Sequence, residues 1–146
     1  MLNRLERFEN FIFDMDGTII DSSEEVLLCL KKACGFHNAE INANNFSPDV
    51  IGPPLWDIVQ AIIVDCENQD LIDKITADFR KIYDNDENDK SEMYENTYRW
   101  LVFLKNSGKK LFLATNKPTT PTKRLLKKFD LDMFEDFYTI DKYEGK

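Results

Sequence analysis

Short apolar runs alternate with longer amphipathic stretches along the chain. The run Phe11–Phe13 is continuously apolar and ends at a polar turn, which is typical of a buried strand in a parallel sheet. The same pattern returns at 111–114 and, more briefly, near 137–140. Helical spacing of apolar residues follows the first run as far as Gly35, and a second helix is predicted just after the run at 111–114.

Between these strand-like runs lies a long segment with helical character. Apolar residues recur with helical spacing at 55–65 and again at 69–84. A strand, a helical insertion, and then a helix, strand, helix and strand predict a parallel sheet covered by helices. The fold class is therefore α/β, with about three strands and a mostly helical insertion after the first strand.

Composition narrows the possible partners. The chain has 146 residues, of which 42% are hydrophobic and 32% charged, as expected for a folded chain rather than a disordered one. Its formal net charge of -8 argues against nucleic acid and anionic membranes as partners, because both bind positive surfaces. The apolar runs are too short to span a membrane, and the charged first ten residues do not resemble a signal peptide, so we expect a cytoplasmic protein.

Polar side chains follow two of the predicted strands. Asp14 and Asp16 come directly after the first, whereas Thr115, Asn116 and Lys117 close the second. Ligands of open parallel sheets bind beyond the carboxyl ends of the strands, so we expect these side chains to meet. Carboxylates alone would repel a phosphate, but with Mg²⁺ between them they suit a phosphoryl group.

This chemistry assigns a role to each residue of the first turn. Asp14 could attack phosphorus and form an aspartyl phosphate, while Asp16 could protonate the leaving alcohol and then activate water. Gly17 would let the backbone pass close to the phosphate and offer an N–H donor, and Thr18 could fix the turn.

Two motifs in these positions resemble a known family. The segment "DMDGT" followed by "IIDS" is similar to the first motif of the haloacid dehalogenase superfamily, and "FLATNKP" resembles the second motif in the form found in phosphoglycolate phosphatases. The segment "IGPPLWDIV" also resembles the helical cap of that subgroup. The resemblance implies a Rossmann-like core at 1–20 and 96–146, with the cap at 21–95.

The family's roles carry over where residues match. The resemblance implies that Asp14 is the nucleophile and a Mg²⁺ ligand, and that Asp16 is the acid/base and gives its carbonyl to the metal. It implies that Thr115 holds the transferring phosphoryl group with Asn116 beside it, and that Lys117 lies near the substrate entrance. The implied activity is Mg²⁺-dependent hydrolysis of a small phosphorylated metabolite similar to phosphoglycolate.

The later motifs of the family match poorly. Lys146 is the candidate for the third-motif lysine, with Lys142 as a competitor, and the fourth-motif acids of the form GDxxxD are not present in this sequence. We therefore expect weak Mg²⁺ binding, impaired turnover and a chain truncated relative to the family. The first strand would be left as an exposed edge that invites self-association. The alternative is a noncatalytic remnant that keeps the fold or serves as a binding module.

Overall fold

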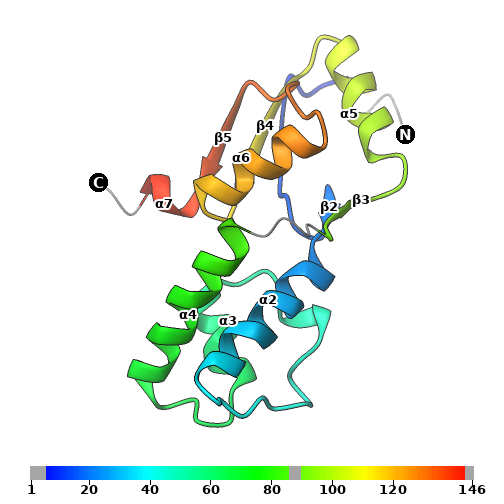
Figure 1. Ribbon diagram of the computed structural model, residues 1–146. Helices are drawn as coiled ribbons and strands as arrows, with labels where there is room; N and C mark the ends of the chain where they lie inside the picture. Colours follow the sequence, from blue (N-terminus) through cyan, green and yellow to red (C-terminus); the bar gives the residue numbers. More distant parts are fainter. Residues whose placement is uncertain (1–5, 86–89, 144–146) are drawn as a thin grey trace. The chain divides into compact units, whose positions relative to one another are not determined.

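The computed structural model describes residues 6–85 and 90–143, and the chain forms two compact units (Figure 1). The first unit comprises Met1–Asp21 and Glu92–Lys146, and the second comprises Ser22–Ser91. Each unit has its own hydrophobic core. The helical unit is thus an insertion in the chain of the first unit.

The first unit is built on a parallel sheet of three strands. They are β1 (Asn10–Phe13), β4 (Lys110–Thr115) and β5 (Asp136–Thr139), in the order β1-β4-β5. The predicted α/β fold with a parallel sheet of about three strands is confirmed. Within the described residues β1 is an edge strand, as expected from the sequence.

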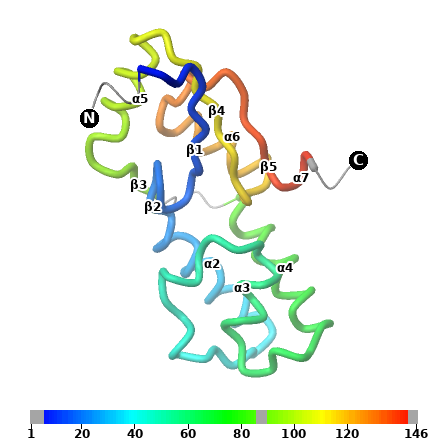
Figure 2. Tube along the Cα trace, turned by 180° about the vertical axis from the view of Figure 1, so that it is seen from behind, coloured from blue at the N-terminus to red at the C-terminus, as the bar shows by residue number. Residues whose placement is uncertain are grey.

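The two faces of this sheet differ sharply. Helices α5 (Thr97–Asn106) and α6 (Thr119–Lys128) cover one face, where Leu111 and Leu113 are completely buried. Figure 2, seen from behind, shows the strands in front of α6, with no helix of this unit over them. On this open face the side chain of Ile12 is 72% exposed. Side chains alternate between the faces of a strand, so the apolar runs of β1 and β4 place apolar groups on both.

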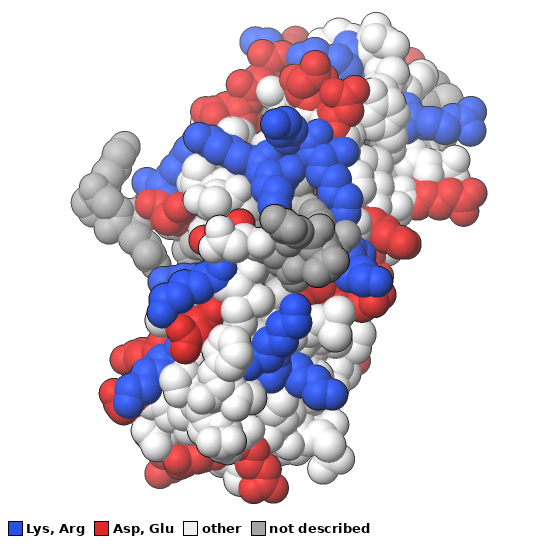
Figure 3. All heavy atoms as spheres, in the orientation of Figure 1, with Lys and Arg blue, Asp and Glu red and all other residues white. Residues whose placement is uncertain are grey.

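Helix α6 is amphipathic. Its buried side carries Pro121, Thr122 and Leu125. Its outer side is strongly basic, and Figure 3 shows lysine and arginine side chains gathered over it. These basic residues are Lys123, Arg124, Lys127 and Lys128. The net negative charge of the chain is therefore unevenly distributed.

Among its described residues, the second unit has helices as its regular elements, together with one isolated β-bridge between Ile41 and Ile63. It contains α2 (Ser23–Phe36), the 3₁₀ turn η1 (Pro48–Val50), α3 (Leu55–Ile62) and α4 (Gln69–Asp84). Its core is formed by the apolar stripes of the three α-helices, as their periodicity predicts. Among the described helices of the chain, none is long and apolar enough to cross a membrane.

A short ribbon and a short helix complete the chain. Strands β2 (Ile20–Asp21) and β3 (Glu92–Met93) pair antiparallel beside the two places where the chain passes between the units. The sequence did not predict this ribbon, because two residues are too few to show a periodicity. Helix α7 (Ile140–Tyr143) follows β5 directly.

A buried acid lies in the first turn of α2. Ser22 makes no side-chain cap hydrogen bond. The Glu25 carboxylate is fully buried and instead accepts a hydrogen bond from the Ser91 hydroxyl at 2.5 Å. This contact ties the first turn of α2 to the residue that precedes β3.

Candidate active site

The turn after β1 is held by its own backbone. The Met15 carbonyl accepts hydrogen bonds from the N–H groups of Thr18, Ile19 and Ile20, and the Met15 and Ile19 side chains are completely buried. Thr18 therefore helps to fix the turn, as expected, and it does so through its backbone. The buried side chains on either side of Asp16 anchor the acidic turn to the core.

Gly17 has the conformation that favours glycine but not the free donor that we expected. Its φ is +76°, a left-handed value that side chains with a Cβ rarely adopt. Its N–H group donates to the Ile20 carbonyl at 2.9 Å, so within the described structure it is committed to the turn and not to a bound phosphate. The glycine shapes the turn rather than contributing a donor.

The electrostatics of the turn involve two acids and one lysine. Partial burial raises the pKa of Asp14, and the nearby negative charge of Asp16 raises it further. A hydrogen bond with the Met15 backbone and the positive charge of Lys117 act in the opposite direction. Asp14 thus lies in the field of both charged neighbours.

Lys117 lies deeper in this unit than we expected. Its ammonium Nζ is 3.3 Å from Asp16 Oδ1, and its side chain is only 6% exposed. The resemblance implied a place near the substrate entrance, and the structure has the lysine buried as a counter-ion of Asp16. One strand end therefore supplies the carboxylates, and the neighbouring strand end supplies a cation.

Thr115 and Asn116 lie at the end of β4. The Thr115 hydroxyl oxygen accepts a hydrogen bond from the Lys117 N–H at 3.1 Å, which leaves its own proton available for donation. Together with Asp14, both residues line a cleft of about 960 Å³ on the open face of the sheet. The structure thus places Asp14, which follows β1, and the polar end of β4 around the same cleft.

The two candidates for the third-motif lysine have different outcomes. Lys146 lies outside the described residues. Lys142 donates from Nζ to the Phe137 carbonyl at 2.6 Å and lies 3.7 Å from Asp136 Oδ1. Lys142, a residue of α7, therefore contacts β5, and β4 separates that strand from the strand that leads to Asp14.

Asp14 and Asp16 are the candidate metal ligands of the turn. Among the described residues, no group of three or more His, Cys, Asp or Glu side chains could hold a metal ion. Mg²⁺, however, is commonly held by one or two carboxylates, with water and substrate phosphate as its other ligands. Asp14 and Asp16 fit that smaller requirement.

One polar network at this end of the sheet was missed by the sequence analysis. Asp141 accepts hydrogen bonds from the Thr119 backbone N–H and hydroxyl, and the Thr119 and Thr139 hydroxyls are 2.7 Å apart. Thr119 is the first residue of α6, and nothing in the sequence pattern connects it with Asp141. Only the adjacency of β5 and α6 in space reveals its partners.

Comparison with known proteins identifies the family. The chain matches the haloacid dehalogenase-like hydrolases over residues 11–146, and it belongs to that family. It is 23% identical to the tyrosine-protein kinase PtkA of Mycobacterium tuberculosis over 83% of this chain. It is 26% identical to the pyrophosphatase PpaX of Bacillus cereus strain B4264 over 95% of this chain.

A solved structure agrees with this assignment. A predicted phosphoglycolate phosphatase from Haemophilus somnus superposes with a TM-score of 0.76 and 26% identity, over 91% of this chain and 63% of that one. The chain spans 40% of the length of PtkA and 62% of the length of PpaX. The family is therefore shown, whereas the activity of the whole protein is a matter for proposal.

Proposed function

We propose that the chain carries the phosphoryl-transfer site of a Mg²⁺-dependent phosphatase acting on a small phosphorylated metabolite. The observation that carries this proposal is the meeting of Asp14 and Thr115 around one cleft, at the carboxyl ends of adjacent strands. Phosphoryl transfer of this kind needs a carboxylate that attacks phosphorus and a hydroxyl group that donates to a phosphoryl oxygen.

Each residue has a defined task in this mechanism. An Asp14 oxygen attacks phosphorus and forms a P–O bond, while the bond to the leaving alcohol breaks and Asp16 supplies the proton that the alcohol requires. Asp16 then removes a proton from water, which attacks the aspartyl phosphate, releases phosphate and restores Asp14. The Thr115 hydroxyl donates to a phosphoryl oxygen throughout. Mg²⁺, held by Asp14 and Asp16, would neutralise negative charge on the phosphoryl oxygens.

The proposal extends to the class of substrate and to the rate of turnover. The names of the relatives include a pyrophosphatase and a predicted phosphoglycolate phosphatase, which supports a compact phosphorylated metabolite such as phosphoglycolate. We expect slow turnover, because the described residues offer Mg²⁺ no group of three or more acidic side chains, and Asp16 would contribute its backbone carbonyl while its side chain serves as the acid/base. The helical unit, Ser22–Ser91, would serve as the cap that selects the substrate.

Two further expectations belong to this proposal. A soluble metabolite as substrate suits a protein of the cytoplasm. The open face of the sheet, and the edge of β1 that pairs with no other strand among the described residues, suit self-association through a second copy of the chain.

The decisive experiment measures turnover of p-nitrophenyl phosphate by the purified chain with and without Mg²⁺. We expect turnover that depends on Mg²⁺ and is abolished in Asp14→Asn, which keeps the shape of the side chain but removes the nucleophile. Asp132→Asn is the matched control, because it removes an exposed acid elsewhere in the same unit. Absence of turnover at saturating Mg²⁺ would support the noncatalytic binding module instead.

A further inference from the structure

A single segment of the chain holds both ends of the loop 115–119. At the start of the loop, Thr115 is the register partner of Thr139 in the parallel ladder. At its end, the Thr119 N–H donates to the Asp141 carboxylate at 3.0 and 3.1 Å, and the Thr119 hydroxyl donates to it at 2.8 Å. Residues 139–141 therefore act as a clamp on the loop that contains Lys117.

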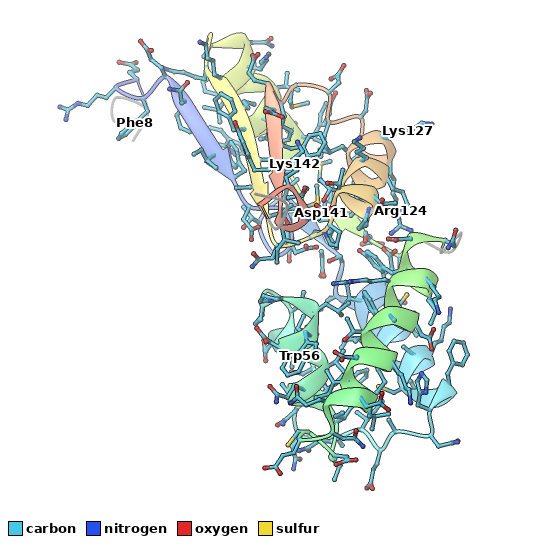
Figure 4. All side chains as sticks on the ribbon, turned by 90° about the vertical axis from the view of Figure 1, so that its left-hand side faces the viewer. Phe8, Trp56, Arg124, Lys127, Asp141 and Lys142 are labelled. Atoms are coloured by element: carbon cyan, nitrogen blue, oxygen red, sulfur yellow. The ribbon has the colours of Figure 1, made fainter. Side chains whose placement is uncertain are left out.

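The clamp is chemically well made. Thr139 is 1% exposed, and its hydroxyl lies 2.7 Å from the Thr119 hydroxyl. Burial raises the pKa of Asp141, but hydrogen bonds from Thr139 and Thr119 lower it more, so the carboxylate is ionised at neutral pH. Its negative charge also faces the first turn of α6, where the helix dipole favours an anion (Figure 4).

Other contacts act on the middle of the loop: Lys117 Nζ lies 3.3 Å from Asp16 Oδ1, and the Pro118 carbonyl accepts hydrogen bonds from the Thr122 N–H and hydroxyl. Between the two clamped residues lie Asn116, which is exposed, Lys117 and Pro118. The Lys117 N–H contact with the Thr115 hydroxyl is internal to the loop. If the Thr119 end were released, the loop would lose its restraint at that end, and the polar groups of Thr115 and Lys117 would be less firmly positioned.

We propose that Asp141 is a positioning residue of the phosphoryl site, which holds the loop 115–119 so that the Thr115 hydroxyl faces the phosphoryl group and Lys117 stays paired with Asp16. Asp141 itself does not touch the substrate in this scheme. The inference rests on the proposed function, because it assumes that the loop binds a phosphoryl group. It adds a residue of α7 to a site that the motifs place only after β1 and β4.

The test compares orthovanadate binding by the wild-type chain and Asp141→Ala, measured by titration calorimetry with Mg²⁺ present. We expect the affinity of Asp141→Ala to fall about tenfold or more, with the urea midpoint of unfolding little changed. Asp141→Asn, which keeps an acceptor oxygen, should lie between the two. Asp132→Ala, which removes an exposed acid of the same unit, should bind orthovanadate like the wild type.

A second variant and a second readout separate the possible failures. Thr119→Val should weaken binding as well, and the double variant should be no worse than Asp141→Ala, because both substitutions release the same contact. Unchanged affinity in Asp141→Ala, or additive losses, would overturn the positioning role. If the wild type does not bind orthovanadate, the proposed function fails, and the clamp is then judged by NMR alone. The amide shifts of residues 115–119 should change in Asp141→Ala but not in Asp132→Ala, and unchanged shifts would overturn the clamp.

Discussion

At the scale of single residues, the contact between Lys117 and Asp16 has the clearest energetic consequence. The lysine side chain is 6% exposed and the aspartate side chain 16%, so each charge depends on its partner more than a surface pair does. We expect Lys117→Met to lower the free energy of unfolding by about 1–3 kcal/mol, because it leaves acids without a nearby cation. Urea unfolding at neutral pH measures this loss.

A matched lysine provides the control for that experiment. Lys142 also pairs with an aspartate of the same unit, but its side chain is 41% exposed, so Lys142→Met should cost no more than about 1 kcal/mol. In a double-mutant cycle, Lys117→Met combined with Asp16→Asn should cost less than the sum of the two single substitutions. Strict additivity would show that the pair is not coupled.

The same residues show how far a site can be predicted from sequence. Asp14 and Thr115 were predicted at strand ends, because a strand end is visible as the place where an apolar run stops. The depth of Lys117 and the commitment of the Gly17 N–H to the turn were not, since both depend on the path of the backbone after the strand. Asp141 was missed for a similar reason: its partner is 22 residues earlier in the chain.

At the scale of elements, β4 is the central strand of the sheet in the first unit, because it lies between β1 and β5. The Leu111 side chain is completely buried beneath the helices. Leu111→Ala should therefore destabilise the unit by about 2–5 kcal/mol, through lost burial and a residual cavity. Urea unfolding, followed by a signal from this unit, would measure it.

An aliphatic residue on the opposite face of the same sheet serves as the control. Ile12 is 72% exposed, so Ile12→Ala should change the stability of the dilute chain by no more than about 0.5 kcal/mol. Equal costs for Leu111→Ala and Ile12→Ala would contradict the assignment of a covered and an open face.

Elements with several turns or several paired residues could be predicted, and the shortest could not. Helix α4 is visible in the sequence because its apolar residues recur over 16 positions. The ribbon of β2 and β3 has two residues in each strand, so nothing in its pattern distinguishes it from a loop. The contact between Glu25 and Ser91 could not be predicted either, because the two residues lie 66 positions apart in the chain.

At the scale of the whole molecule, the open face of the sheet favours association with a second copy. The outer edge of β5 is engaged by Lys142, which donates to the Phe137 carbonyl, whereas β1 presents Ile12 at the other edge. Lys110 lies at the amino end of this face and Asp14 near its carboxyl end. Two copies packed face to face about a twofold axis that runs across the strands would set each lysine against the partner's Asp14.

This arrangement makes a prediction about oligomeric state and activity together. Light scattering over a concentration series should show a monomer that converts to a dimer, because an apolar face and complementary charges are buried on association. Ile12→Lys should keep the chain monomeric by placing a charge in the centre of the face. Leu28→Lys, a substitution at a 41% exposed position of α2, should leave association unchanged. Because dimers would cover Asp14, turnover per chain should fall as wild-type concentration rises and stay constant for Ile12→Lys. A wild-type chain that is monomeric at every concentration, or a loss of dimers in Leu28→Lys, would contradict association through this face.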